Sequence, residues 1–129
     1  MRVKIDSADK LFSQYVRLRD MKCQRCFSRV EFNDKGLPIS HQASHYFGRS
    51  AESTRFDPEN VDTLCWGCHQ HWGSTNREEY REFKIRQLGE SGFKFLMIRN
   101  NAYKKKDRKF EVIKWKLALK ELKNLSTPH

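Results

Sequence analysis

The chain lacks long apolar runs. Hydrophobic residues make up 37% of its 129 residues, and no stretch approaches the roughly 18 uninterrupted apolar residues that a membrane-spanning helix needs. Residues 1–10 alternate charged and apolar side chains and contain no apolar segment of the kind that forms a secretory signal. These absences argue against a membrane protein and against export, so we expect a cytoplasmic protein with no membrane partner.

Cysteine is also scarce, and its placement is informative. The four cysteines form two pairs, Cys23 with Cys26 and Cys65 with Cys68, and two residues separate the members of each pair. Disulfides are rare in a reducing cytoplasm, whereas thiolates spaced in this way can turn toward one tetrahedral ion. We therefore predict a structural Zn²⁺ ion bound by all four cysteines.

Acidic residues are few compared with basic ones. Lysine and arginine number 26 against 16 for aspartate and glutamate, which gives a formal net charge of +10. Such a charge attracts polyanions, and nucleic acid is the expected partner. A basic composition alone fits a solvated surface equally well, so the cysteine and histidine pattern has to decide between the two.

The length of the chain leaves room for one domain, whose core is small enough to benefit from a metal staple. We predict a single α+β domain over residues 1–129. It comprises an N-terminal helix (1–22), a zinc-bound core (23–72) and a helical C-terminal region (73–129).

Apolar spacing and capping residues predict the helices. Phe12 and Val16 share one face of a first helix, with Asp6 or Ser7 as its N-cap, and Asn76 followed three residues later by Glu79 has the form of a capping box. Helices are expected at about residues 7–20, 76–88, 90–99 and 107–125. Strands are expected at 27–33 and 37–45 around the turn at residues 33–36, followed by a polar loop over 47–60. Trp66 and Trp72, beside the second cysteine pair, are expected to lie in the core or to cover the zinc.

Six short motifs occur in one order along the chain. They are Asp9-Lys10-Leu11-Phe12-Ser13, Arg17-Leu18-Arg19-Asp20, Cys23-Gln24-Arg25-Cys26, Ser44-His45-Tyr46-Phe47-Gly48-Arg49, Thr54-Arg55-Phe56-Asp57-Pro58-Glu59-Asn60 and Leu64-Cys65-Trp66-Gly67-Cys68-His69. In this order they resemble the phage lambda NinG (Rap) recombination family and, more widely, the HNH superfamily of endonucleases. The resemblance covers residues 8 to about 96. It implies a zinc-stapled treble-clef ββα-metal (HNH) core with flanking N-terminal and C-terminal helices.

The same resemblance implies an activity. Family and superfamily members are metal-dependent DNA endonucleases that hydrolyse phosphodiesters, and this family points to branched recombination intermediates such as Holliday junctions or D-loops in the cytoplasm of a phage-infected bacterium. Nicking or packaging of DNA by an HNH endonuclease is an alternative. A two-fold junction would favour a homodimer.

Carried onto this sequence, the resemblance makes His45 the first histidine, Asn60 the asparagine and His69 the last histidine of the HNH motif. A neutral imidazole suits His45 as general base, and His69 is expected to hold a catalytic Mg²⁺ or Mn²⁺ ion. Asn60 is expected to bond the backbone that holds His45 in place. Arg49 and Arg55 are suited to bidentate contacts with DNA phosphates.

The sequence departs from the commonest HNH pattern at Ser44, because many superfamily members carry an acidic metal ligand immediately before the first histidine. The second ligand of the catalytic ion therefore stays open. Asp57, Glu78 or Glu79 could supply it, whereas His41 lies about 13 Å from His45 along an extended strand. Ser44 also supports an alternative function, a non-catalytic zinc-stabilised DNA-binding module that accompanies recombination proteins.

A haem protein is a weaker alternative. Residues 65–69 have the Cys-x-x-Cys-His pattern of covalent haem attachment. Covalent haem attachment would not explain the first cysteine pair, and it would not account for the positive net charge of the chain.

Overall fold

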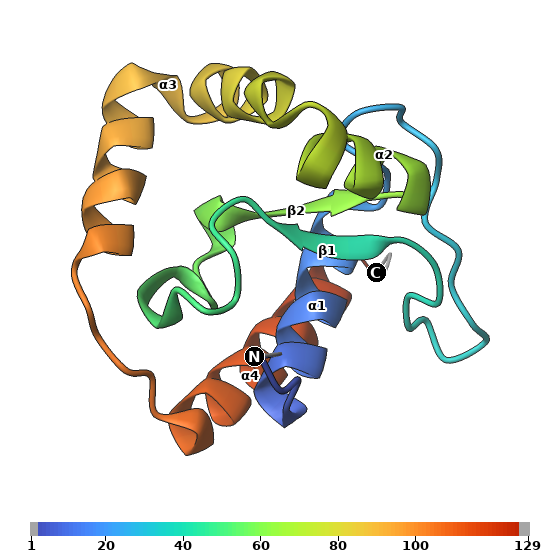
Figure 1. Cartoon of the computed structure of the whole chain (residues 1–129). Helices are drawn as coiled ribbons and strands as arrows, with labels where there is room; N and C mark the ends of the chain where they lie inside the picture. Colours follow the sequence, from blue (N-terminus) through green and yellow to red (C-terminus); the bar gives the residue numbers. More distant parts are fainter. Residues whose placement is uncertain (1–2, 127–129) are drawn as a thin grey trace.

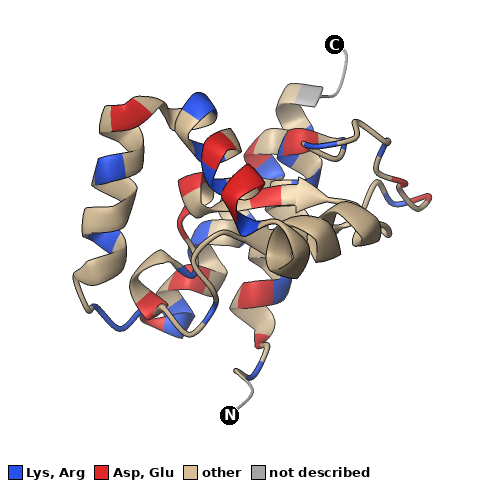
Figure 2. Cartoon of the chain, turned by 45° about the horizontal axis from the view of Figure 1, so that its top comes forward, with Lys and Arg blue, Asp and Glu red and all other residues tan. Residues whose placement is uncertain are grey.

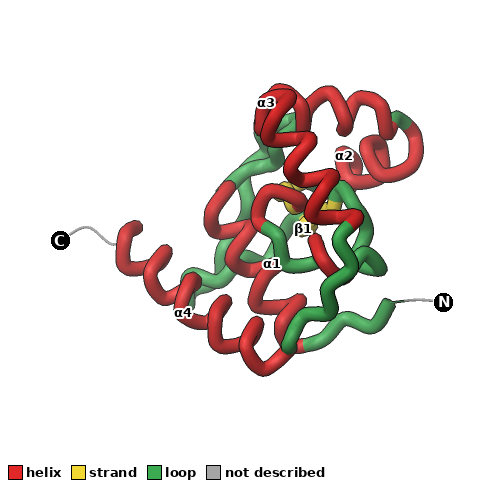
Figure 3. Tube along the Cα trace, turned by 90° about the vertical axis from the view of Figure 1, so that its left-hand side faces the viewer, coloured by secondary structure: helices red, strands yellow, loops and turns green. Residues whose placement is uncertain are grey.

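Two short strands lie at the centre of the molecule, with helices on both sides (Figure 1). The computed structural model describes residues 3–126. In chain order the elements are α1 (Ser7–Asp20), β1 (Gln42–His45), the 3₁₀ turns η1 (Glu52–Thr54) and η2 (Pro58–Asn60), β2 (Val61–Leu64), α2 (Trp66–Gln70), the π-helical turn η3 (His71–Thr75), α3 (Arg77–Asn101) and α4 (Arg108–Ser126). Helices α1 and α4 pack together on one side of the strands, and α2 and α3 cover the other side (Figure 3). The mixed α+β class is confirmed.

Helix α1 begins and ends where its sequence predicts. The backbone N–H of Asp9 donates to the Asp6 side chain at 3.0 Å, and the backbone N–H of Asp6 donates to the Asp9 side chain at 2.9 Å, which forms a capping box. The helix ends at Met21, which adopts the left-handed conformation with φ 62°. Phe12 and Val16 are buried on its inner face, as their spacing predicts.

The sheet differs from the predicted hairpin. Strand β1 pairs antiparallel with β2, so that Ser44 lies opposite Asp62. The predicted strand at residues 27–33 does not form, because this segment makes only the isolated bridges Lys22–Arg29 and Phe32–Pro38. The actual partner strand, Val61–Leu64, is buried at all four positions, two of them polar. It therefore shows no alternation of apolar and polar residues that would mark a strand.

Helix α3 joins the two helices predicted over residues 76–99. Asn76 caps it, since its side chain accepts a hydrogen bond from the backbone N–H of Glu79 at 3.1 Å. Gly89 then breaks the helical path with φ 77° and ψ 165°, a conformation that glycine adopts readily. The second half of α3 returns to the loop before β2, where Arg99 donates to Asp57 at 2.7 Å and Thr54 donates to Asn100 at 2.9 Å.

The apolar core has two parts. Between α1, α4 and the strands, Trp115 packs against Phe12 with ring centroids 4.6 Å apart. Between α2, α3 and the strands, Trp72 stacks on Tyr80 at 4.7 Å. Trp72 lies in the core, as expected. Trp66 opens α2 at the surface and is 63% exposed, so it is not a core residue.

A buried ion pair joins α3 to β2. Lys84 donates to Asp62 at 3.0 Å, and both side chains are at most 1% exposed. Gln87 donates to the other oxygen of Asp62 at 3.0 Å, and the Tyr80 hydroxyl lies 3.0 Å from Asp62 and from the carbonyl oxygen of Ser44. Because every member has a partner, this network fixes α3 against the centre of the sheet.

The surface carries charges of both signs. Lysine and arginine occur on helices and in loops alike, with acidic residues interspersed among them (Figure 2). None of the helices between residues 3 and 126 combines the length and the apolar character needed to cross a bilayer.

We predict that Asp62→Ala lowers the free energy of unfolding by about 3–5 kcal/mol, because it leaves the Lys84 ammonium buried without a counter-charge. Urea denaturation followed by circular dichroism measures this change. The control is Glu78→Ala, which removes an exposed ion pair with Arg81 and should cost less than about 1 kcal/mol. Equal effects of the two substitutions would contradict the structural role of the Asp62 network.

Candidate metal centre and active site

The four cysteine side chains meet at one point. Their sulfur atoms all lie within 4.8 Å of one another, and those of Cys26 and Cys65 are 3.7 Å apart. Two sulfurs bound at about 2.3 Å to one tetrahedral ion are about 3.8 Å apart, so this spacing fits a zinc site. The first pair follows α1, whereas Cys65 is the N-cap of α2 and Cys68 lies within that helix. The cluster could therefore hold a structural metal such as zinc.

Hydrogen bonds around the cluster favour sulfur in its thiolate form. The backbone N–H groups of Arg25 and Cys26 each donate to the sulfur of Cys23 at 3.4 Å. The Arg25 guanidinium donates to the sulfur of Cys68 at 3.4 Å and to Glu79 on α3 at 2.9 Å. Donors of this kind stabilise negative charge on metal-bound sulfur and orient the ligands. They also connect the cysteine cluster to α3.

Two surface hollows lie on either side of the predicted HNH histidines. The larger, of about 480 Å³, extends toward Gly73 and Arg77, and the smaller, of about 360 Å³, extends toward Arg49. His45, Gly48 and His69 line both hollows. The structure thus brings the end of β1 and the end of α2 to one open groove, beside the π-helical turn η3.

His45 is neutral at physiological pH and has a defined tautomer. Its Nε2 lies 2.9 Å from the backbone carbonyl oxygen of Arg55. A carbonyl only accepts, so Nε2 carries the hydrogen and Nδ1 keeps the lone pair. Burial, helped by the positive charge of Arg49, lowers the pKa of His45 from 6.5 to about 4. The unprotonated form of the imidazole therefore predominates at neutral pH.

Asn60 connects the two ends of the loop that follows His45. Its Oδ1 accepts from the backbone N–H of Phe47 at 2.8 Å, and its Nδ2 donates to the carbonyl oxygens of Phe47 and Thr54 at 2.9 and 3.0 Å. The side chain is fully buried. Every polar atom of the amide is thus used to hold the loop backbone beside His45.

His69 projects from α2 toward the same groove. Its Nδ1 lies 3.1 Å from the hydroxyl oxygen of Ser44, which is buried at the place of the usual acidic ligand. Burial, with a contribution from Arg49, lowers the pKa of His69 below 6.5. A neutral imidazole is the form that can bind a metal ion.

Two arginines border the groove. The Arg49 side chain is 32% exposed, and its Nε lies 3.9 Å from Asp9 without a hydrogen-bond partner among residues 3–126. On the other side, Arg77 donates to the carbonyl oxygen of Tyr46 at 2.9 Å and lies over the Tyr46 ring. The motif analysis missed Arg77. A signal was present, because a cation at the first position of a helix opposes the helix dipole.

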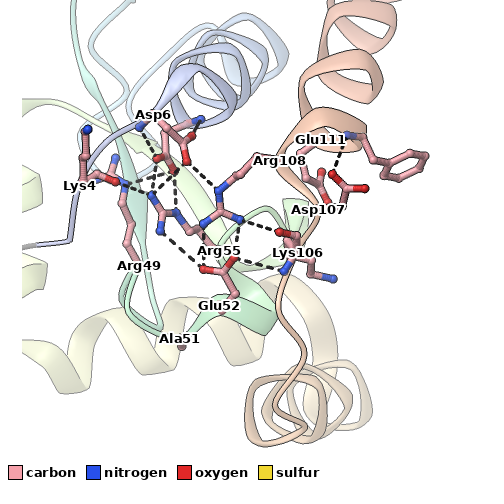
Figure 4. Close-up of polar contacts among 12 residues, drawn as sticks. Lys4, Asp6, Arg49, Ala51, Glu52, Arg55, Lys106, Asp107, Arg108 and Glu111 are labelled. Carbon is pink, nitrogen blue, oxygen red and sulfur yellow. Dashed lines mark hydrogen bonds and ion pairs between the residues drawn. The ribbon is translucent and has the colours of Figure 1, made fainter.

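Arg55 differs from Arg49 because it belongs to the interior. It is 4% exposed, its Nε donates to Asp9 at 2.9 Å, and a second nitrogen donates to the carbonyl oxygen of Lys4 at 2.7 Å. Figure 4 shows the guanidinium between Asp6 and Glu52, with Arg108 of α4 beside it. Burial opposes ionisation of Asp9, but the hydrogen bonds from Arg55 and Asp6, together with the positive charge of Arg55, outweigh it and hold the pKa of Asp9 below its usual value. A contact with DNA phosphate requires an exposed guanidinium. The guanidinium of Arg55 is buried, so Arg55 is not placed for the predicted phosphate contact.

The other candidate ligands of a catalytic ion are engaged elsewhere. Asp57 pairs with Arg99, Glu78 with Arg81, and Glu79 with Arg25 and His71. His41 bonds Ser28 and Ser40. Within residues 3–126 the four cysteines are the one group of three or more potential metal ligands that converges. His45 and His69 are the two imidazoles that line the hollows, and the described part of the chain places no carboxylate in the lining beside them.

Comparison with known proteins gives one match. The model of the family described as bacteriophage lambda NinG protein matches residues 2–126. Neither the curated proteins nor the solved structures contain a match to this chain. Since the family model covers nearly the whole length, including α4, the chain belongs to the bacteriophage lambda NinG family.

Proposed function

We propose that this protein is a divalent-metal-dependent DNA endonuclease with an HNH ββα-metal site. The observation that carries the proposal is the pair of neutral imidazoles, His45 and His69, in one open groove bordered by Arg49 and Arg77. The order β1, β2, α2 around the cysteine cluster supports a treble-clef ββα arrangement. A groove with cationic borders is suited to a phosphodiester backbone.

In this mechanism His45 is the general base. Its Nδ1 takes a proton from the water that attacks the phosphorus atom, and the Arg55 carbonyl oxygen stabilises the resulting imidazolium through Nε2–H. Asn60 holds the loop in position. Arg49, whose side chain is 32% exposed, contributes positive charge toward the phosphoryl oxygens.

The proposed catalytic ion is Mg²⁺ or Mn²⁺, and His69 would hold it. When bound, such an ion stabilises negative charge on the leaving oxygen. The chain supplies a neutral nitrogen and the hydroxyl of Ser44, whereas Mg²⁺ prefers carboxylate and phosphate oxygens. The donor set fits an ion that is shared with DNA phosphate and water, so we expect weak binding of the ion in the absence of DNA.

We further propose that the substrate is branched DNA formed during phage recombination. Membership of the NinG family supports this proposal, and the irregular, open groove is compatible with recognition of DNA shape. A second candidate is a DNA-binding module without catalysis. It is favoured because, within residues 3–126, no carboxylate lines the two hollows beside His69. Cleavage assays decide between the two.

We predict that His45→Ala abolishes most cleavage and retains DNA binding. The loss should be about 10²- to 10⁴-fold, which is the usual contribution of a positioned general base. The assay is Mg²⁺- or Mn²⁺-dependent nicking of a four-way junction, with binding measured separately by fluorescence anisotropy. The control is His41→Ala, which removes a histidine bonded to Ser28 and Ser40 and should leave cleavage unchanged.

The pH dependence tests the same assignment. Because the folded pKa of His45 is lowered to about 4, the base form predominates at any higher pH. The contribution of His45 to the cleavage rate should rise as pH increases through about 4 and be constant above about pH 5. Full cleavage by His45→Ala would refute the assignment of His45 as base.

We predict that substitution of Arg49 changes DNA binding, whereas substitution of Arg55 changes stability. Arg49→Ala should weaken DNA binding and leave the free energy of unfolding nearly unchanged, because this guanidinium is partly exposed and makes no close ion pair. Arg55→Ala should lower the free energy of unfolding by about 3–5 kcal/mol, because it leaves Asp9 buried and unpaired. Urea denaturation and anisotropy titration at low salt measure the two quantities. If an Arg55→Ala variant were fully stable and bound DNA more weakly, the result would support the phosphate contact that the sequence predicts for Arg55.

We predict one zinc ion per chain and a fold that depends on it. Cys65→Ser should remove the ion and lower the melting temperature strongly, since metal binding and folding are linked in small zinc domains. Zinc content is measured by mass spectrometry of the metal and stability by thermal denaturation. As a control, zinc but not Mg²⁺ should restore the melting temperature of protein treated with a chelator. An unchanged melting temperature in Cys65→Ser would contradict a stabilising role of the zinc ion.

A further inference from the structure

Phe27 adopts a conformation that its side chain does not favour. It directly follows Cys26 in the first cysteine pair, its φ is 66°, and it is 63% exposed. The left-handed region is strained for a bulky residue and is unstrained for glycine. The ring is thus held at the surface, at a position where the backbone favours glycine and where little apolar area is buried. The contact given for the ring is the Lys22 ammonium, which lies over it, and such a contact does not require the strained backbone. Strain of this kind at an exposed ring points to a use for the ring.

Two cations lie opposite each other beside this ring. Lys22 and Arg29 form an antiparallel bridge, with Val30 N–H donating to Met21 O at 3.0 Å. Directly opposed residues of a bridge project to the same face, where like charges repel each other. Both side chains are exposed, and neither forms an ion pair within residues 3–126. An anion bound between them would remove this repulsion.

The ring and the cations border one hollow. It has a volume of about 630 Å³ and is lined by Met21, Phe27, Val30 and Phe32, together with Lys22 and Arg29. The Lys22 ammonium lies 5.1 Å from the centroid of the Phe27 ring. Asp20 is the acidic residue at this hollow, and its carboxylate is already bound by Arg19 at 2.8 Å and by the backbone N–H of Thr63 at 3.0 Å. The free polar groups of the hollow are therefore cationic, and its floor is apolar.

We propose that this hollow is a nucleotide subsite, in which an unpaired DNA base stacks on Phe27 and its phosphate lies between Lys22 and Arg29. An aromatic face with adjacent cations is the chemistry that binds single-stranded nucleic acid. The inference rests on the proposed function in taking DNA as the ligand. It adds a second contact region, because the hollow shares no residue with the groove of His45 and His69.

The cysteine cluster places this subsite at a fixed position relative to the groove. Phe27 follows Cys26, and the sulfur of Cys26 lies 3.7 Å from that of Cys65, the N-cap of the helix that carries His69. One DNA molecule could therefore contact both regions only where an unpaired base is available near the scissile strand. Branched and flapped DNA provide such bases and a continuous duplex does not, so the subsite gives the nuclease a preference for DNA with unpaired positions.

The test compares two DNAs that differ in one single-stranded flap. Fluorescence anisotropy gives the affinity of the intact protein for a labelled duplex with the flap and for the same duplex fully paired. Phe27→Gly should lose about 5- to 150-fold in affinity for the flap DNA, which corresponds to the stacking energy of one base, and should bind the paired duplex as the wild type does. Phe27→Trp should retain the affinity. Phe110→Ala, which removes another exposed aromatic ring, should have no effect.

The melting temperature of the variant distinguishes a DNA-binding role of Phe27 from a structural role. Phe27→Gly relieves the left-handed strain, so its melting temperature should be equal to or higher than that of the wild type. A lower melting temperature with unchanged flap affinity would show that Phe27 is a packing residue and would overturn the proposal. Equal wild-type affinity for both DNAs would also overturn it while leaving the endonuclease proposal intact. Failure of the wild type to bind either DNA would overturn both.

Discussion

The convergence of four cysteine side chains constrains most of the remaining structure. A metal ion bound to all four would fix the end of α1 to the start of α2 and would close the whole segment between the two cysteine pairs into a loop. Ordering such a loop costs conformational entropy, and a chain of this size has little apolar surface with which to offset that cost. Within the closed loop, pairing of β1 with β2 then brings Ser44 and His45 beside α2, which carries His69.

Buried polar residues hold the loop after β1 and support the strands. Asn60 holds the loop after β1 through three hydrogen bonds, and the network of Tyr80, Asp62 and Lys84 supports the strands from the side of α3. On the opposite side, Arg55 and Asp9 join the same loop to α1. Burial of any of these polar groups without a hydrogen-bond partner would cost free energy. Because they bond one another in one arrangement, they define a single position for the loop. Within the groove, His45 is held by the backbone carbonyl of Arg55, and His69 bonds the buried hydroxyl of Ser44.

Local signals in the sequence were sufficient for some elements and insufficient for others. Helix α1 and the start of α3 were predictable because their capping residues lie within three positions of one another. The spacing of the cysteines likewise predicted their convergence. Strand β2 was not predictable, because Asp62 and Thr63 are buried through contacts with α3 and α1 that no local pattern reveals. The burial of Arg55 depends on Asp9, which is distant in the sequence, so its motif position alone suggested an exposed residue.

The break at Gly89 divides α3 into two arms with different attachments. Through Lys84, the first arm is fixed to the strands; through Arg99 and Asn100, the second arm is fixed to the loop that also carries Arg49. A single glycine links the two arms, and a glycine tolerates a change in its backbone angles more readily than any other residue. The kink at Gly89 therefore lets one helix act as a bracket that holds both the strands and the loop of Arg49.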